Sequence, residues 1–337
     1  MILILSKESD FSTDLVTDWL DKLGGSYMRL HAENIYPYIE NLPLSSKLSE
    51  INLPDRSIKI ADTNVIWYRR WEPYKNLEKI NLDNSEIAKE ISETQKEDRK
   101  LLNNFIFSLF SKGLWINPYD KGSVNKMQQL IEAENVGLLI PSSIISSSKN
   151  IVSAFYEKNQ SIITKSFETN IDLTINNRFY TSYTSRLNKR DLDYLPETFA
   201  PSLFQAEIKK AFEVRSFYLD GKFYSMAIFS QYDKTTSVDF RKYNYSKPNR
   251  TMPFELPSDI KYKLKLLMKR LGLLTGSFDL IVTKENQYVF LEVNPSGQFG
   301  MVSEPCNYDL NKIIATYLIK KDNEKNLSRK NISRNAN

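Results

Sequence analysis

Three oxygen-bearing side chains near the C-terminus, Asp279, Glu292 and Asn294, have the types and the spacing to bind a divalent cation. They lie in two runs rich in Val, Ile, Phe and Leu that flank the polar connector Lys284–Gln287. A connector of this length predicts an antiparallel hairpin, and pairing its two end residues places Asp279 directly opposite Glu292. Asn294 then follows two residues later on the same face.

The alternation of side chains along a strand gives this hairpin one apolar face and one mixed face. The apolar face is predicted to carry Phe278, Leu280, Val282, Val289, Leu291 and Val293. Ile281 and Phe290 join the polar residues on the other face, which indicates that this face is covered rather than open to water. The two carboxylates that face each other there repel, so they favour a bound cation. All-oxygen ligands suit Mg²⁺ shared with phosphate oxygens. The alternative is a pair of solvated acids on an edge hairpin.

The composition excludes several function classes. The chain has 337 residues, a net charge of +5, one cysteine (Cys306) and one histidine (His31). Intrachain disulfides, thiolate zinc clusters and His-based triads are therefore excluded, and the small positive charge does not indicate nucleic acid binding. Residues 1–5 are too short for a signal segment, and no run reaches transmembrane length. We expect a cytoplasmic protein without a membrane partner, and a homodimer is left open.

The hairpin carries a family resemblance. An Asp on one strand, with Glu-x-Asn-Pro closing the next, resembles the metal-binding hairpin of ATP-grasp ligases. The longer stretch LEVNPSGQFG, Leu291–Gly300, resembles the peptide maturases that make microviridin-type macrocycles (graspetides), especially the grasp-with-spasm branch. The resemblance covers nearly the whole chain. It implies an α/β protein with the ATP-grasp fold: an N-terminal pre-grasp α/β domain, a central domain and a C-terminal ATP-binding domain.

We expect four segments on this basis. Residues 1–116 form the pre-grasp domain, with strands near 1–5, 27–30, 57–60 and 65–68 and helices over 12–23 and 85–111. Residues 117–204 form the central part, with a helix over 122–137 and a peptide-binding hairpin. Residues 205–321 form the C-terminal part, with helices over 258–271 and 311–320. Residues 322–337 are polar and free of aromatic residues, which predicts a disordered tail.

The resemblance also implies nucleotide-binding residues. Lys126 and Lys165 match the two phosphate lysines, Gln205 precedes the adenine hinge formed by Glu207 and the Ile208 backbone, and Glu213 matches the ribose-binding acid. Arg215 and Arg241 match arginines at the transferred phosphate. Arg241 lies in the sequence Asp239-Phe-Arg241 of a long polar loop over 231–257, where Asn244 is one residue out of the family register. A surface position for Lys126 and a plain salt bridge between Glu213 and Arg215 are the alternatives.

Two further segments suit an acidic peptide. Residues 170–187, in a stretch without glycine, predict a hairpin with a turn at Asn176-Asn177, in the neighbourhood that resembles the leader-binding part of peptide maturases. Its basic side chains and those that follow are Arg178, Arg186, Lys189 and Arg190. An ordinary basic hairpin is the alternative. In the sequence WYRRW, Arg69, Arg70 and Trp71 can grip a carboxylate, or the arginines pack on the aromatic residues at a strand end.

The resemblance implies an ATP- and Mg²⁺-dependent macrocyclase. It would activate Asp or Glu side chains of a ribosomally made precursor peptide (leader plus core) as acyl-phosphates, and join them to Ser or Thr as esters or to Lys as amides. A second nucleophile profits from a general base, for which Asp239 and Glu213 are both candidates. Two alternatives stay open: a ligase for free amino acids or for adding glutamate to a protein end, and a leader-binding protein without catalysis.

Overall fold

The chain divides into two compact units, which we describe separately. The computed structural model describes residues 1–32, 42–45, 47–53, 56–71, 85–122, 124–167, 172–176, 178–181, 183–231, 246 and 248–335. Unit 1 comprises Met1–Gly122 and Asp309–Asn337, and unit 2 comprises Ser123–Tyr308. The expected boundaries assigned residues 309–321 to the C-terminal segment, whereas the structure groups them with the N-terminal unit.

Unit 1 is built on a parallel sheet of four strands in the order β2-β1-β5-β6. The strands are β1 (Ile2–Leu5), β2 (Tyr27–Leu30), β5 (Val65–Tyr68) and β6 (Leu114–Ile116). All of β1 is buried, as an apolar run in a parallel sheet covered on both faces should be. The expected strands at 1–5, 27–30 and 65–68 are confirmed.

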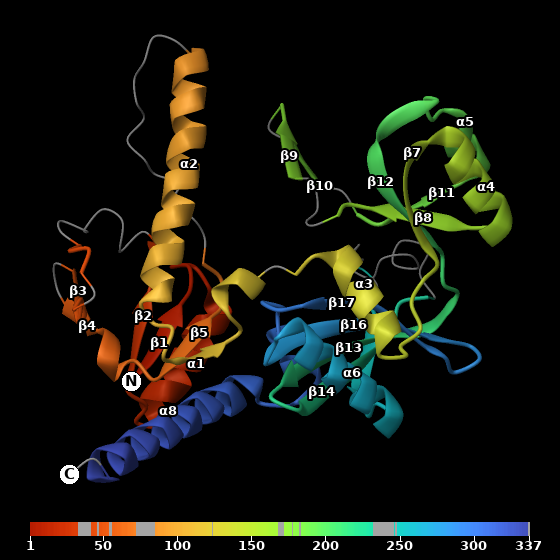
Figure 1. Ribbon diagram of the computed structural model, residues 1–337. Helices are drawn as coiled ribbons and strands as arrows, with labels where there is room; N and C mark the ends of the chain where they lie inside the picture. The colour runs from red at the N-terminus through yellow and green to blue at the C-terminus, as the bar shows by residue number, and fades with distance from the viewer. Residues whose placement is uncertain are drawn as a thin grey trace. The chain divides into compact units, whose positions relative to one another are not determined.

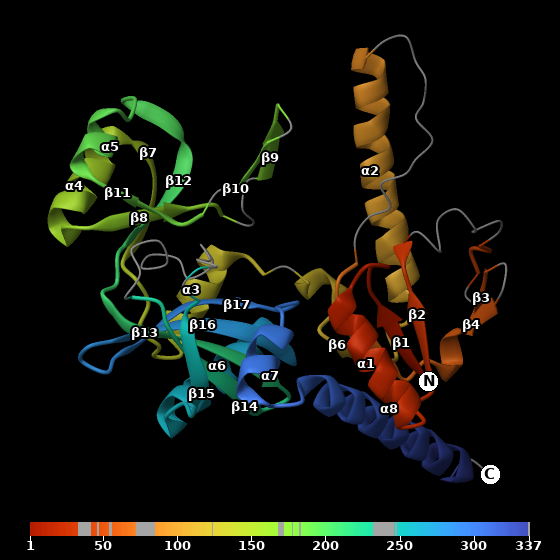
Figure 2. The same ribbon diagram turned by 180° about the vertical axis from the view of Figure 1, so that it is seen from behind.

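Helices α1 (Phe11–Lys22) and α8 (Leu310–Asn335) lie side by side in unit 1, as both views show (Figures 1 and 2). The tail expected to be disordered from residue 322 is instead helical to Asn335. Asp322 is buried and accepts hydrogen bonds from the Met1 amino group at 2.7 Å and the Asn64 amide at 2.6 Å. These polar contacts stabilise the helix beyond residue 320, where the apolar pattern that predicted the helix ends.

The remaining elements of unit 1 are peripheral. The strand expected near 57–60 is β4 (Arg56–Lys59), which pairs with β3 (Glu50–Leu53) in a separate hairpin rather than in the main sheet. Single 3-10 turns span Ile60–Asp62 and Tyr119–Lys121. The charged helix α2 (Ser85–Ser108) ends three residues before the expected end. Its apolar C-terminal half packs through Ile106 and Phe107 on the sheet.

Unit 2 contains two main sheets. The first is antiparallel, in the order β11-β8-β12-β7, formed by β7 (Ser143–Ser148), β8 (Ile162–Lys165), β11 (Ser185–Leu187) and β12 (Thr198–Ala206). Helices α4 (Lys149–Asn159) and α5 (Lys189–Asp193) cover it through Val152, Phe155 and Leu192. The predicted hairpin at 170–187 is β9 (Asp172–Ile175) paired with β10 (Arg178–Thr181). Asn176 has the left-handed φ of 50° that its turn requires.

The second sheet of unit 2 has the order β15-β14-β13-β16-β17 and is also antiparallel. Its strands are β13 (Lys210–Leu219), β14 (Lys222–Phe229), β15 (Arg250–Phe254), β16 (Thr275–Thr283) and β17 (Tyr288–Asn294). Helices α3 (Lys126–Asn135) and α6 (Ser258–Leu271) pack on it, with α3 beside β17 (Figure 1). Gly272 ends α6 in the left-handed region, as expected.

The structure adds two elements that the sequence did not indicate. Strand β15 lies inside the segment 231–257 that we expected to be a loop, and it extends the sheet at its edge. Helix α7 (Gly300–Cys306) follows the β16–β17 hairpin despite Pro305, and its Val302 and Cys306 pack against Met226 and Ile228 of β14. None of the described helices combines the length and apolar content needed to cross a membrane.

Candidate functional site

The predicted pairing of the two carboxylates is confirmed. Asp279 on β16 is the cross-strand partner of Glu292 on β17. The turn residue Asn286 has a φ of 59°, and the Thr283 amide donates to the Gln287 carbonyl at 3.0 Å. The polar connector is therefore a hairpin turn with one residue in the left-handed region.

The side-chain faces predicted for β17 are partly wrong because the hairpin contains a bulge. The register shifts between Asp279 and Leu280, so Leu280 pairs with Phe290 and Leu291 is the extra residue. Phe290 therefore lies in the apolar core, fully buried, whereas Leu291 is only half-buried. The bulge turns Glu292 to the polar face without moving the strand's apolar residues out of the core.

The amide and the two carboxylates converge on one spot. The Asn294 amide nitrogen lies 3.2 Å from Glu292 Oε1 and 3.4 Å from Asp279 Oδ2. The carboxylate side chains are 12% and 15% exposed, so water reaches them without solvating them fully. A half-turn of the Asn294 amide presents its oxygen instead, which makes three oxygen donors on one face.

Two cationic side chains flank the acids. Arg215 on β13, opposite Asp279, donates from Nη1 to Asp279 Oδ1 at 2.7 Å and to Oδ2 at 3.0 Å. Lys126 Nζ lies 3.3 Å from Glu292 Oε2. The buried Nε of Arg215 has no hydrogen-bond partner, so this guanidinium can still donate to a ligand.

Helix α3 holds Lys126 in place through a residue that sequence reasoning missed. Asn125 caps the helix by accepting from the amides of Met127 and Gln128. One turn after Lys126, the buried Gln129 accepts a hydrogen bond from the Val293 amide at 2.8 Å and donates to the Val124 carbonyl at 3.0 Å. Val293 stands between Glu292 and Asn294, so this contact fixes α3 against the β16–β17 hairpin.

Glu213 lies deeper in the same sheet, two residues before Arg215. Its carboxylate is paired with the Lys210 ammonium and accepts from Ser230 Oγ at 3.0 Å. Burial raises the pKa of Glu213; Lys210 and Ser230 lower it in part, and the nearby charge of Asp279 raises it further. The sequence analysis did not identify Lys210 and Ser230 as partners of Glu213, although the position of Lys210 three residues before Glu213 could have indicated the first of these pairs. A ribose contact by Glu213 stays a prediction.

The expected adenine hinge lies between β12 and β13. Arg186 forms a bidentate ion pair with the Glu207 carboxylate, in which Arg186 Nε donates to Glu207 Oε2 at 2.6 Å. The same carboxylate oxygen accepts from Ser161 Oγ at 2.6 Å. Burial alone would raise the pKa of Glu207, but Arg186 and Ser161 hold it below its ordinary value. Since its side chain is committed to Arg186, only the backbone of Glu207 remains for an adenine.

Three other residues were predicted to bind the nucleotide near this hinge. The buried Gln205 donates from its amide to Ser143 Oγ at 2.8 Å, and its carbonyl oxygen has no hydrogen-bond partner. Lys165, at the end of β8, pairs in register with Leu203 of β12. The Ile208 backbone lies just before β13. Their roles toward a nucleotide stay predictions, and Arg241, Asp239 and Asn244 lie outside the described residues.

The donor set fits Mg²⁺ better than a softer ion. The described part of the chain contains no cluster of three or more His, Cys, Asp and Glu side chains that could enclose a metal. Two carboxylates and one amide instead leave most of an octahedral shell to other oxygens, which is how Mg²⁺ is held when it is shared with nucleotide phosphates. The unpartnered Nε of Arg215 beside Asp279 is consistent with an anion arriving together with the metal.

Comparison with known proteins finds solved structures of similar fold. No protein-family model and no curated protein sequence matches the chain. Among solved structures, the chain is 27% identical to the macrocyclase MdnC of Microcystis aeruginosa MRC, bound with the precursor peptide MdnA, at a TM-score of 0.79, covering 95% of this chain and 99% of that one. It is 25% identical to a RiPP-associated ATP-grasp ligase of Chryseobacterium gregarium, in complex with ADP and a leader and core peptide, at a TM-score of 0.82, covering 95% and 96%.

A third similar structure shows the fold alone. The ATP-grasp ligase PsnB, complexed with a phosphomimetic variant of a minimal precursor, Mg and ADP, is 17% identical at a TM-score of 0.72, covering 95% of this chain and 98% of that one. The fold and the acidic hairpin together define an ATP-grasp ligase. Within that class the chain is similar to peptide-modifying members, namely MdnC and the Chryseobacterium enzyme.

Proposed function

We propose that this protein is an ATP- and Mg²⁺-dependent macrocyclase that joins side chains of a ribosomally made precursor peptide. The observation that carries the proposal is the Asp279–Glu292 pair with Asn294 beside it, flanked by Lys126 and Arg215. The similar MdnC and Chryseobacterium structures, which hold precursor or leader and core peptides, support a peptide substrate. An activity that consumes ATP is expected in the cytoplasm.

The reaction has two steps. A substrate Asp or Glu carboxylate attacks the γ-phosphorus of ATP, which forms an acyl-phosphate and releases ADP. A Ser or Thr hydroxyl then attacks the acyl carbon, loses its proton and displaces phosphate to give an ester, while a Lys amine gives an amide. Each ring thus removes one water from the peptide. These steps depend on positioning and on neutralising charge rather than on a protein nucleophile.

Each site residue has a part in this scheme. Bound Mg²⁺, held by Asp279, Glu292 and Asn294, supplies positive charge to the terminal phosphates. Lys126 and Lys165 bind phosphate oxygens, and Arg215 and Arg241 stabilise the transferred phosphoryl group. The Glu207 carbonyl and the Ile208 amide bind the adenine edge next to Gln205, and Glu213 binds ribose. Lys126 and Arg215 pair with the carboxylates, so phosphates and metal together can exchange those partners.

The β9–β10 hairpin is the part we assign to leader binding. In its register Tyr180 pairs with Leu173 and Arg178 pairs with Ile175, which places all four on one face. Leu173, Ile175 and Tyr180 are each about half exposed. A two-stranded hairpin with an exposed apolar face is only marginally stable alone, so a peptide that covers this face would stabilise it. Arg186, by contrast, is already paired with Glu207.

Mass spectrometry of candidate peptides incubated with the protein, ATP and Mg²⁺ tests the proposal. The candidates are short Thr- and Glu-rich peptides, to be sought in the reading frames beside this gene. We expect loss of one water per ring with wild type, none with Glu292→Gln, and wild-type behaviour for Glu285→Gln, an exposed acid in the turn of the same hairpin. ADP release with free amino acids but no peptide dehydration would favour an amino-acid ligase. Peptide binding without ADP release would indicate a leader-binding protein.

A further inference from the structure

Residues 295–299 leave the β16–β17 hairpin beside the candidate Mg²⁺ ligands, and the proposed reaction gives them no part. Asp279 and Glu292 form one cross-strand pair, and Ser277 and Asn294 form another pair two residues further along the hairpin. Side chains two residues apart in a strand share a face, so all four lie on the polar face. Ser277 is therefore a direct neighbour of the candidate ligands.

Ser277 differs from these neighbours because it is fully buried. It is 0% exposed, whereas the Asp279 and Glu292 side chains are 15% and 12% exposed. Its hydroxyl oxygen has no hydrogen-bond partner among the described residues. A buried hydroxyl without a partner costs free energy, so no polar contact explains why Ser277 is covered. The explanation is in the packing above it.

The turn after β17 covers Ser277. The Gly297 amide donates to the Asn294 carbonyl at 3.0 Å, which closes a β-turn with Pro295 in the second position, where a proline φ is favourable. A Cβ atom built on Gly297 would lie 2.5 Å from both Cβ and Oγ of Ser277. The turn therefore folds back over the polar face, and the backbone of Gly297 contacts the Ser277 side chain.

Space, and not backbone conformation, requires glycine at position 297. Gly297 lies outside the left-handed region that Gly272, for example, occupies. The atoms that a Cβ would meet belong to a fully buried side chain on a strand, which cannot swing away. The Asn294 carbonyl oxygen, at 3.0 Å, narrows the space further. A larger residue at position 297 must therefore push the turn away from β16.

The segment is also fixed at its far end. Phe299 is 1% exposed, and its ring packs against that of Phe217 with the ring centroids 5.5 Å apart. Phe217 on β13 is the cross-strand partner of Ser277. The chain after β17 thus crosses the polar face along the row that Asn294, Ser277 and Phe217 form, next to the row of charged residues.

The contact between Gly297 and Ser277 determines where the Asn294 side chain lies, because Asn294 is the first residue of the turn. Its amide nitrogen is 3.2 Å from Glu292 Oε1 and 3.4 Å from Asp279 Oδ2. Mg²⁺ demands a near-ideal octahedron with ligands at about 2.0–2.1 Å. A shift of the turn by a few tenths of an ångström would therefore be felt in the affinity for the metal.

We propose that Gly297 and Ser277 are positioning residues, whose close contact holds the Asn294 amide beside the two carboxylates so that the three can share one Mg²⁺. The metal rests on the proposed function, whereas the contact rests on the packing of the turn against β16. Both residues act through Asn294. A Cβ at position 297 is accommodated only when position 277 has none.

Binding of Mn²⁺ to the full chain in the presence of ADP, measured by electron paramagnetic resonance of the free ion, tests the proposal. Mn²⁺ takes oxygen ligands as Mg²⁺ does. We expect Gly297→Ala to raise the Kd for Mn²⁺ at least about tenfold, as loss of a group that orients a ligand does. Adding Ser277→Gly removes the atoms at 2.5 Å and should return the Kd to within about threefold of wild type. Adding Ser277→Ala instead leaves the Cβ in place and should not.

Gly300→Ala is the matched control in the same segment. A Cβ on Gly300 would meet only Glu304 Oε1, at an ordinary distance of 3.7 Å. We expect Gly300→Ala and Ser277→Gly alone to bind Mn²⁺ like wild type. The melting temperature of each variant is measured as well, because a merely structural contact would lower it and leave the Kd for Mn²⁺ unchanged.

Four results would overturn the proposal: no Mn²⁺ binding by wild type, an unchanged Kd in Gly297→Ala, an equal rise in Gly300→Ala, or a melting temperature that Ser277→Gly restores without restoring the Kd. Should Gly297→Ala be too unstable to measure, Ser277→Thr replaces it. This substitution adds one methyl group at the same fully buried contact, so an unchanged Kd would again overturn the proposal.

A peptide assay separates this inference from the proposed function. With a peptide that wild type dehydrates, Gly297→Ala is expected to raise the Mg²⁺ concentration for half-maximal turnover about tenfold. Dehydration with an unchanged Mg²⁺ dependence would overturn the positioning role and keep the macrocyclase. Failure of every peptide to react, together with Mn²⁺ binding that Gly297→Ala weakens and Ser277→Gly restores, would overturn the macrocyclase and keep the positioning role.

Discussion

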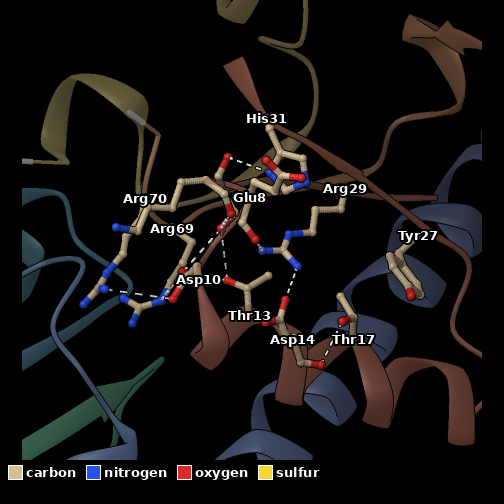
Figure 3. A network of polar contacts seen from close by, with 12 residues as sticks. Glu8, Asp10, Thr13, Asp14, Thr17, Tyr27, Arg29, His31, Arg69 and Arg70 are labelled. Carbon is tan, nitrogen blue, oxygen red and sulfur yellow. Dashed lines mark hydrogen bonds and ion pairs between the residues drawn. The ribbon is translucent and has the colours of Figure 1, made fainter. Parts of the chain in front are cut away.

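Two charged clusters among the described residues are built in different ways. In unit 2, Asp279 faces Arg215 and Glu292 faces Lys126, so each carboxylate has a cationic partner of its own. In unit 1, Arg69 and Arg70 both lie at ion-pair distance from one carboxylate, that of Asp10 (Figure 3).

The clusters also differ in how firmly their charges are held. Asp10 is 1% exposed and Arg69 is 4% exposed, whereas Glu292 and Lys126 are 12% and 19% exposed. A buried charge that loses its partner cannot be solvated, and a half-buried one can turn toward water. The same type of substitution should therefore affect catalysis in one cluster and folding in the other.

The largest effect is expected from Asp279→Asn. The substitution keeps the size of the side chain but removes a carboxylate that we propose as a Mg²⁺ ligand, and it leaves Arg215 without the negative charge of Asp279. We expect dehydration of a precursor peptide to slow about a thousandfold, in line with losses of one preorganised charge-stabilising group. Single-turnover mass spectrometry measures the rate, and fluorescence anisotropy of a labelled leader should show unchanged binding. Dehydration at the wild-type rate would remove the hairpin from the active site.

Asp10→Asn is the matching change in unit 1, and its effect should be on stability. Two guanidinium groups then lie side by side with no carboxylate between them. We expect the free energy of unfolding to fall by about 3 kcal/mol, as when one partner of a buried ion pair is removed. Urea unfolding followed by tryptophan fluorescence measures this loss.

Two further variants define the contrast with Asp10→Asn. Glu8→Gln, an exposed acid in the same loop, should change stability little. Glu292→Gln should cost less than about 1 kcal/mol, because Lys126 can reach water. Equal losses for Asp10→Asn and Glu292→Gln would mean that the two clusters do not differ in the way their burial indicates.

Gln129→Leu tests how the cluster around Glu292 is held together. Leucine leaves the buried Val293 amide without its acceptor, which should lower stability by about 2 kcal/mol. Because Val293 separates Glu292 from Asn294, the Mg²⁺ concentration for half-maximal turnover should also rise. Gln128→Leu, an exposed neighbour on the same helix, should change neither quantity. A loss of stability with unchanged Mg²⁺ dependence would make Gln129 a structural residue only.

The sequence predicted the parts of these clusters that depend on local spacing. Cross-strand pairing of Asp279 with Glu292 was predicted from the length of the connector, but the strands next to the turn pair one residue out of that register, Val282 with Tyr288, and the bulge restores the predicted pair. The strand end at Arg69 follows from an apolar run. The bulge after Asp279 could not be predicted, because nothing in the alternation of residues marks the extra Leu291. As a result Phe290 was assigned to the wrong face.

Long-range polar contacts were the other feature that could not be predicted from the sequence. In the sequence Gln129 is an ordinary polar helix residue. Its contact with β17 depends on the packing of α3 against that strand, and no pattern within α3 indicates it. Asp322 likewise stands in a polar segment, and only the Met1 amino group and Asn64, far away in the chain, explain why the helix continues past it. Both residues act through partners more than a hundred positions away in sequence, where periodicity carries no information.

The smallest effect is expected from Arg186→Gln, which supplies an exposed reference for both clusters. Arg186 is 51% exposed and pairs with Glu207 at the hinge. Pairs of this kind contribute roughly 0.5 kcal/mol in solvent. The pKa of Glu207 is lowered in the folded state, so its contribution is present at neutral pH and disappears as the pH falls through that lowered value.

The stability difference between wild type and Arg186→Gln should therefore be small at pH 7 and vanish in acid, as measured by urea unfolding at several pH values. Arg190→Gln, which removes an arginine that packs over Tyr194, should show no such pH dependence. A difference at pH 7 as large as that of Asp10→Asn would show that exposure does not govern the strength of these ion pairs. In that case the distinction between the partly exposed cluster around Glu292 and the buried cluster around Asp10 would lose its physical basis.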